Sequence, residues 1–114
     1  MPKESAIVGA IVRAAKADGW WTMKIHGGPY QISGVPDLLC IRNGEAVFLE
    51  VKQPGKKPTQ IQVARMLEIE KVGKAKCFVT TSKEDAIEKL RTHQKVQHRD
   101  ALDHSVDRCE RRCL

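Results

Sequence analysis

The sequence predicts an α/β fold in which a mixed four-stranded sheet is flanked by helices. Apolar residues at helical spacing open the chain and give way to the alternation that is typical of strands. Two further apolar runs are joined by Asn43-Gly44, a strong two-residue hairpin signal. A capped helical segment then precedes a last strand, and such a strand–helix–strand connection favours a partly parallel sheet.

The first helix is predicted over residues 3–18. Its apolar residues recur at positions i, i+3, i+4 and i+7, which gives one core-facing stripe: Ile7, Ala10, Ile11 and Ala14. Gly19 is expected to end the helix. Glu4 falls on the edge of the stripe, and its simplest role is to complement the positive end of the helix dipole.

Three strands are predicted next, over residues 20–26, 37–42 and 45–52. In the first, Trp21, Met23 and Ile25 alternate with polar residues, so we expect their side to be buried. A glycine-rich loop over residues 27–34 follows, and glycines allow close approach of a ligand to the backbone. The second and third strands pair antiparallel through the Asn43-Gly44 turn.

The second half of the domain is predicted to be a basic loop, a helix, a strand and a helix. Thr59 is a suitable N-cap for a helix over about residues 60–72, which Gly73 would end. A strand is expected over residues 75–81, and Ser82 opens a helix that continues to about Leu90. We therefore predict one domain over residues 1–91, followed by a charged tail, 92–114, that extends the helix or is disordered.

Composition restricts the classes of partner. The chain has 114 residues, 41% of them hydrophobic, and a formal net charge of +6, which favours a polyanion such as DNA without requiring one. No apolar run reaches the roughly 18 to 20 residues that span a bilayer, so no membrane partner is expected. The N-terminus lacks the compact apolar block of a signal peptide, and we expect a cytoplasmic protein with reduced thiols.

The four cysteines raise the question of a metal site. Cys40 and Cys77 fall within apolar runs, so we interpret them as small buried hydrophobic residues. Cys109 and Cys113, with His104, could contribute to a zinc site, but no fourth ligand is evident at a suitable spacing. We expect the tail to bind no zinc.

Charged residues gather at one end of the predicted hairpin. Residues whose numbers add to about 87 lie opposite each other, so Asp37 is expected beside Glu50. Lys52 shares the side of Glu50 because alternate strand residues point the same way. Two adjacent carboxylates repel unless a cation lies between them, and hard oxygen ligands suit Mg²⁺ or Mn²⁺. The simpler interpretation is an exposed salt-bridge cluster, because Glu-x-Lys is common.

The segment "KIHGGPYQISGVPDLLCIRNGEAVFLEVKQPGKKPTQIQ" carries a family resemblance. Asp37 followed by Glu50-Val51-Lys52 matches the motif of the PD-(D/E)xK nuclease superfamily. The whole segment resembles its VRR-NUC branch, which occurs as stand-alone phage and bacterial proteins and as the nuclease domain of the Fanconi-associated nuclease. The resemblance covers about residues 4–81 and implies a restriction-endonuclease-like core with the element order αβββαβ. If the protein is phage-encoded, its compartment is the host cytoplasm.

The resemblance also implies roles for individual residues. Mg²⁺ or Mn²⁺ would be bound by three groups: the carboxylates of Asp37 and Glu50 and the backbone carbonyl of Val51. Lys52 would orient the attacking water and stabilise the transition state. The family has an acid on its first helix, which Glu4 matches.

A glutamine early in the following helix belongs to the family pattern as well. Gln62 fits this position best and Gln60 less well. In this role, Gln62 would position water or Lys52. An ordinary solvated glutamine is the alternative for each. Family members often have Thr/Ser-Pro before this glutamine, whereas Pro58 precedes Thr59 here, so the cap geometry can differ.

The implied activity is that of a metal-dependent, structure-selective endodeoxyribonuclease. Its expected substrate is branched DNA such as a four-way (Holliday) junction, which two sites of a homodimer would cut symmetrically. The alternatives are a monomeric flap or single-strand-end nuclease and a non-catalytic DNA-binding module. Candidate contacts to the phosphate backbone come from the glycine-rich and basic loops: Gly27, Gly28, Lys56 and Lys57. A solvated basic loop is the alternative for the two lysines.

Overall fold

The computed structural model describes residues 2–25, 27 and 32–92. Its sheet has the strand order β1-β2-β3-β4, with the bounds β1 (Trp21–Lys24), β2 (Leu38–Arg42), β3 (Glu45–Val51) and β4 (Lys76–Thr80). Strand β2 pairs antiparallel with both β1 and β3, whereas β3 and β4 are parallel. The predicted mixed sheet is confirmed.

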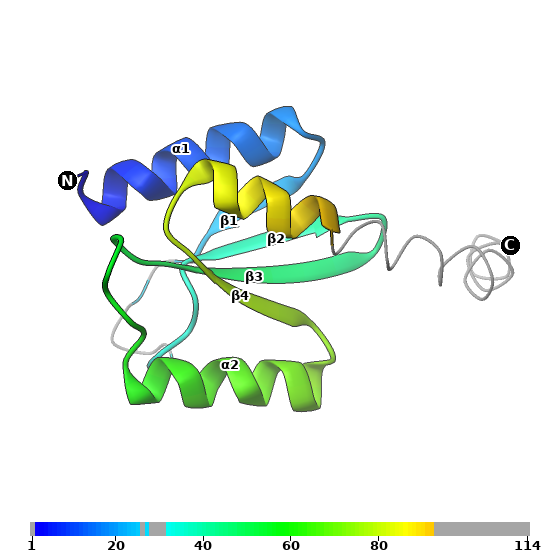
Figure 1. The fold of residues 1–114 in the computed structure, drawn as a ribbon. Coiled ribbons are helices and arrows are strands. Elements are labelled where there is room, and N and C mark those ends of the chain that lie inside the picture. Colours follow the sequence, from blue (N-terminus) through cyan, green and yellow to red (C-terminus); the bar gives the residue numbers. More distant parts are fainter. Residues whose placement is uncertain (1, 26, 28–31, 93–114) are drawn as a thin grey trace, which may run out of the picture.

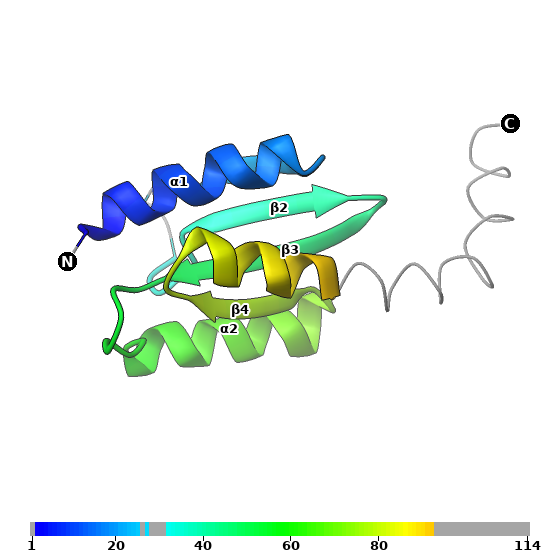
Figure 2. The ribbon, with the colours of Figure 1, turned by 45° about the horizontal axis from the view of Figure 1, so that its top comes forward.

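Helices cover the two faces of the sheet unequally. Helix α1 (Glu4–Ala17) and the last helix, described over residues 83–92, lie on one face. Helix α2 (Gln60–Gly73) lies on the other face, alongside β3 and β4 (Figures 1 and 2). The fold is therefore three-layered over β3 and β4, and within the described residues it is two-layered over β1 and β2.

The main core lies between α1 and the face of the sheet that α1 covers. Ile11 and Ala15 of α1 are fully buried, as is Leu90 of the last helix. They pack against side chains that alternate along the two central strands: Leu38, Cys40, Val47, Leu49 and Val51. The alternate side chains of β3, which include Phe48 and Glu50, therefore point to the α2 side.

The β2–β3 hairpin has the predicted register. Its paired residues add to 87, from Arg42 opposite Glu45 to Leu38 opposite Leu49. Asn43 and Gly44 both adopt positive φ angles, 53° and 79°, as a type I′ turn requires. Asp37 lies one step before β2 and Glu50 lies one step beyond the last pair, so the turn chemistry brings these two residues together.

Local capping signals explain the ends of the later helices. The Thr59 side chain accepts a hydrogen bond from the Gln62 amide, and the Gln62 side chain accepts one from the Thr59 amide, which completes a capping box. The Ser82 hydroxyl accepts from the Asp85 amide, as the last helix was predicted to begin. One detail was predicted wrongly: Lys74, not Gly73, adopts the left-handed conformation that ends α2.

The side of β1 that faces the core is the opposite of the one that its alternation predicts. Thr22 is buried, whereas Trp21 is 57% exposed and Met23 is 43% exposed. The apolar contribution to the core comes instead from Trp20, which precedes the strand. The prediction was wrong because alternation separates two sides of a strand but does not show which side another layer covers.

The predictions for the cysteines, for a membrane span and for the glycine-rich loop can be compared with the structure only where it describes the residues. Cys40 is buried, as predicted, and burial raises the pKa of its thiol to about 11, whereas Cys77 is only half-buried. Among the described residues, no helix is long and apolar enough to cross a membrane. The predicted strand residue His26, the loop residue Gly28 and the cysteines of the tail lie outside the described residues.

Candidate active site

Asp37 is held at the start of β2 by backbone and side-chain hydrogen bonds. Its carbonyl accepts from the Ile25 amide at 2.8 Å, which extends the pairing of β1 with β2. Its carboxylate oxygen Oδ2 accepts from the Val51 amide at 2.8 Å, across the hairpin. Burial raises the pKa of Asp37, the nearby Glu4 charge raises it further, and the Val51 and Lys52 interactions oppose this rise.

Glu50 is the most unusual carboxylate in the described part of the chain. It lies in the central strand β3 with only 2% of its surface exposed. Burial, followed by repulsion from Asp37, raises the pKa of Glu50 to about 7, although Lys52 acts in the opposite direction. A buried acid beside a second acid is energetically unfavourable as an anion, and a bound cation would relieve that cost.

Lys52 provides the positive charge of this cluster. Its Nζ lies 3.5 Å from Oε2 of Glu50, and its side chain is largely buried. Its backbone amide donates to the Thr80 carbonyl at 2.9 Å, so the parallel strand β4 fixes the chain just beyond the end of β3. The structure therefore brings together Asp37, Glu50 and Lys52, as the hairpin register predicts.

Glu4 approaches the same carboxylates from the first turn of α1. Its charge contributes to the raised pKa values of both Asp37 and Glu50, which places it near them. The Gln53 side chain donates to the Pro2 carbonyl at 2.9 Å and so ties the start of α1 to the end of β3. Sequence reasoning missed this contact because no local pattern links residues so far apart in the chain.

Gln62 is in the first turn of α2, where its side-chain oxygen accepts from the Thr59 amide at 2.8 Å. Among the described residues, no acceptor is hydrogen-bonded to its side-chain nitrogen. The alternative candidate, Gln60, is exposed at the first position of α2. A catalytic role for either glutamine stays a prediction.

The loop before Asp37 is packed against α2. Arg65 donates to the Ser33 carbonyl at 3.0 Å. Gly34 has φ +81°, and a Cβ placed there would lie 2.7 Å from the carbonyl oxygen of Ile61. Only glycine combines this backbone conformation with such a close contact. The sequence did not indicate these contacts, which join the loop to a helix that follows it by nearly thirty residues.

The predicted DNA contacts lie on exposed loops. Lys56 and Lys57 are exposed between β3 and α2. Gly27 is also exposed, with nothing within 4 Å of a Cβ placed there. Gly28 lies outside the described residues. The roles of these residues in DNA binding stay predictions.

The donor set fits a hard divalent cation that keeps other ligands. No group of three His, Cys, Asp or Glu side chains in the described residues could by itself hold a metal ion. Mg²⁺, however, is often bound by one or two carboxylates, with water and substrate phosphate completing its coordination. The adjacent carboxylates of Asp37 and Glu50, one of them buried with a raised pKa, meet that requirement.

Comparison with known proteins identifies a structural relative. No family model matches the sequence, and no curated protein matches it. A solved structure described as "VRR_NUC domain" is similar to this chain with a TM-score of 0.66 and 29% sequence identity. The similarity covers 82% of this chain and 98% of that chain, so it includes nearly the whole of the solved domain.

Proposed function

Because the chain is a VRR-NUC domain protein, with the fold of a nuclease domain, we propose that it hydrolyses DNA phosphodiesters with Mg²⁺ or Mn²⁺. The observation that supports this proposal best is the pair of carboxylates at the open end of the β2–β3 hairpin, Asp37 and Glu50, with Lys52 beside them. A nuclease needs ligands for a cation and a positive group beside the reacting phosphate. These three residues supply both.

In the proposed reaction, Asp37, Glu50 and the Val51 carbonyl would hold the cation. A bound Mg²⁺ or Mn²⁺ supplies Lewis acidity, which polarises a phosphoryl oxygen and lowers the pKa of water. Lys52 orients the attacking water and stabilises negative charge that develops on the phosphoryl oxygens. The Val51 amide holds the Asp37 carboxylate in place before substrate binds. Glu4 and Gln62 act at the margins of the site, where they position water or Lys52.

We propose branched DNA as the substrate class, with the four-way junction as its main member. The described residues contain no separate module that reads base edges, and lysines on a loop contact phosphates without regard to sequence. Symmetric cutting of a junction requires two sites, which a two-fold homodimer supplies. A monomer that cuts flaps or single-strand ends is the alternative.

Cleavage of a panel of labelled linear, flap and four-way-junction DNAs tests the activity. The wild-type protein should cut with Mg²⁺ or Mn²⁺ and stop when a chelator is added. Asp37→Ala and Glu50→Ala should abolish cleavage while DNA binding persists. Lys52→Ala should lower the rate by roughly 10²–10³-fold, the usual effect of removing one group that stabilises transition-state charge.

A matched control is Glu84→Ala, which removes an exposed carboxylate from the last helix and should leave the rate unchanged. If either carboxylate variant of the site cuts at the wild-type rate, the site assignment is wrong. DNA binding by the wild type without any metal-dependent cleavage would instead favour the non-catalytic module.

A further inference from the structure

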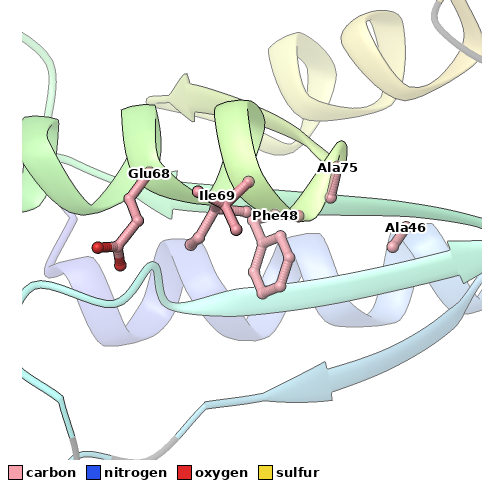
Figure 3. Close-up of a pocket in the computed structure, with 7 residues that line it drawn as sticks. Ala46, Phe48, Glu68, Ile69 and Ala75 are labelled. Carbon is pink, nitrogen blue, oxygen red and sulfur yellow. The ribbon is translucent and has the colours of Figure 1, made fainter.

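Strand β4 is more deeply buried at its end than at its start. Between α2 and the sheet lies a hollow of about 550 Å³, which Ala75, the residue before β4, lines together with Phe48 and Ile69 (Figure 3). The first residue of the strand, Lys76, is exposed, whereas the last, Thr80, is fully buried. Parts of a strand with few buried contacts open easily, so Thr80 marks the end at which β4 is fixed.

The Thr80 hydroxyl is the buried polar group at this end of the strand. It donates to Oδ2 of Asp85 at 2.8 Å and also lies 3.1 Å from the Ser82 carbonyl. Burial raises the pKa of Asp85, but the hydrogen bonds from Lys89 and Thr80 outweigh this effect and hold that pKa below its ordinary value. Thr80 is therefore bonded to a charged carboxylate, which is a stronger acceptor than a neutral group.

Lys89 adds a second contact from the last helix to the end of β4. Its Nζ lies 2.9 Å from Oδ2 of Asp85 and donates to the Val79 carbonyl at 2.6 Å. Two successive carbonyls of β4 are thus held by different partners, that of Val79 by Lys89 and that of Thr80 by the Lys52 amide. We call the side chains of Thr80, Asp85 and Lys89 the β4 clamp.

The Thr80 carbonyl is the point where the β4 clamp meets the candidate active site. It accepts from the Lys52 amide at 2.9 Å, just beyond the end of β3. Strand β2 pairs with β3 only as far as Leu49, so the strand pairing nearest to Lys52 is that with β4. A shift of the Thr80 carbonyl would therefore move the Lys52 backbone and, with it, the ammonium group that lies 3.5 Å from Glu50.

We propose that Thr80 and Asp85 are positioning residues for Lys52. The β4 clamp fixes the Thr80 carbonyl, and this carbonyl fixes the backbone from which the Lys52 side chain reaches the candidate active site. The catalytic meaning of this contact rests on the proposed function, in which Lys52 orients water and stabilises developing charge. A displacement of about 1 Å in such a group can lower a rate by roughly 10²-fold, so a clamp outside the site can control the reaction.

Steady-state cleavage of a DNA that the wild type cuts tests the role of the clamp. Thr80→Val keeps the shape of the side chain but removes its hydroxyl. It should lower kcat roughly 10–100-fold with little change in KM, because the groups that contact substrate remain. Thr80→Ser restores the hydroxyl and should recover most of the rate. Asp85→Ala, at a partly exposed position, should act like Thr80→Val and provides the measurement if that variant does not fold.

Ser82→Ala is the matched control for loss of stability in the same region. It removes the hydroxyl that accepts from the Asp85 amide, but it keeps the carbonyl near Thr80. The last helix should become less stable, as a lower urea midpoint would show, while kcat stays unchanged. A fall in kcat as large as that of Thr80→Val would overturn the proposal, and so would a wild-type kcat in folded Thr80→Val and Asp85→Ala.

Combination with Lys52→Ala shows whether the clamp acts through Lys52. Thr80→Val should lower kcat when Lys52 is present and should have no further effect in the Lys52→Ala protein, because coupled residues are not additive. The same fold-change in both backgrounds would mean that the effect does not pass through Lys52, and the proposal would be wrong.

Hydrogen exchange of the Lys52 amide tests the clamp without catalysis. In chelator, Thr80→Val and Asp85→Ala should each speed exchange at this amide at least about tenfold relative to the amides of the β2–β3 hairpin. Exchange that is unchanged, or that rises equally at all amides, would overturn the clamp even if the protein is a nuclease. A wild type that cuts no DNA would refute the proposed function and the catalytic use of the clamp, while exchange would still show whether the clamp fixes Lys52.

Discussion

At the scale of single residues, Glu50 combines burial with a neighbouring like charge. A carboxylate in that setting keeps its proton up to about neutral pH, because both effects disfavour its charged form. At the proposed metal site, protons and divalent cations would compete for the same oxygens. If Glu50 binds the cation as proposed, metal affinity should increase as the pH rises through about 7.

The same shift predicts how stability depends on pH without metal. The folded-state pKa of Glu50 is about 7 and its ordinary value is 4.5. The folded state therefore binds the proton more tightly, and the contribution of Glu50 to stability falls as the pH rises between these values. Glu50→Gln removes this penalty and should stabilise the protein at pH 8 by up to about 3 kcal/mol, at 1.36 kcal/mol per pKa unit.

Urea unfolding in chelator at pH 4.5 and at pH 8 measures this difference. The stability advantage of Glu50→Gln over the wild type should be large at pH 8 and small at pH 4.5. Added Mg²⁺ should narrow the gap at pH 8, because it stabilises only the protein that retains the carboxylate. An advantage of the same size at both pH values would show that Glu50 titrates normally.

At the scale of helices and strands, the local signals predicted most of the structure. The Asn43-Gly44 turn fixed the register that pairs Asp37 with Glu50, and Thr59 marked the start of α2. These features depend on residues adjacent in sequence. The exposed side of β1 and the bond from Gln53 to Pro2 depend on which distant segments meet, and alternation or capping patterns carry no such information.

Two substitutions at Gln62, in the first turn of α2, separate its role in helix capping from its proposed role in catalysis. Gln62→Glu keeps a side-chain oxygen that can accept from the Thr59 amide, but it removes the N–H donors. Gln62→Ala removes both and should cost about 1 kcal/mol through loss of the cap interaction. If Gln62 donates to water or Lys52, both variants should lose cleavage activity, whereas only the alanine variant should lose stability.

Steady-state cleavage rates and urea midpoints of the two variants decide between these roles. Thr59→Ala is the matched control, because it weakens the same cap without touching the glutamine amide. It should lose stability and keep most of its activity. A Gln62→Glu protein that cuts as fast as the wild type would confine Gln62 to helix capping.

At the scale of the whole molecule, the candidate active site lies beside a basic loop. Glu50 and Lys52 lie at the end of β3, where the Val51 amide bonds Asp37, and the chain continues from there into the loop with Lys56 and Lys57. Figure 2 shows the course of this loop from β3 to α2. The net charge of +6 supplies long-range attraction to a polyanion. Repulsion between phosphate and the two acids would be offset locally by Lys52 and by the proposed cation.

The dependence of DNA binding on salt tests the contribution of the basic loop. Each phosphate contact to duplex DNA contributes about 0.9 to the slope of log affinity against log salt concentration. Lys56→Ala and Lys57→Ala should each reduce that slope by about this amount if they contact the backbone. Fluorescence anisotropy in chelator measures binding without cleavage. Lys83→Ala, an exposed change on the last helix, is the control. Slopes that stay unchanged would leave the loop lysines as solvated surface charges.

The β2–β3 hairpin carries the two carboxylates at one end and its turn at the other, so a probe attached at the turn would lie far from the candidate active site. Strand β3, with seven residues or roughly 23 Å of extended chain, separates the Asn43-Gly44 turn from the end that carries Glu50. An insertion within either strand would shift one acid relative to the other, whereas a longer turn leaves the pairing of the strands intact. A fluorophore carried on an enlarged turn would therefore report the approach of labelled DNA through energy transfer, while the distance between the two acids remained fixed.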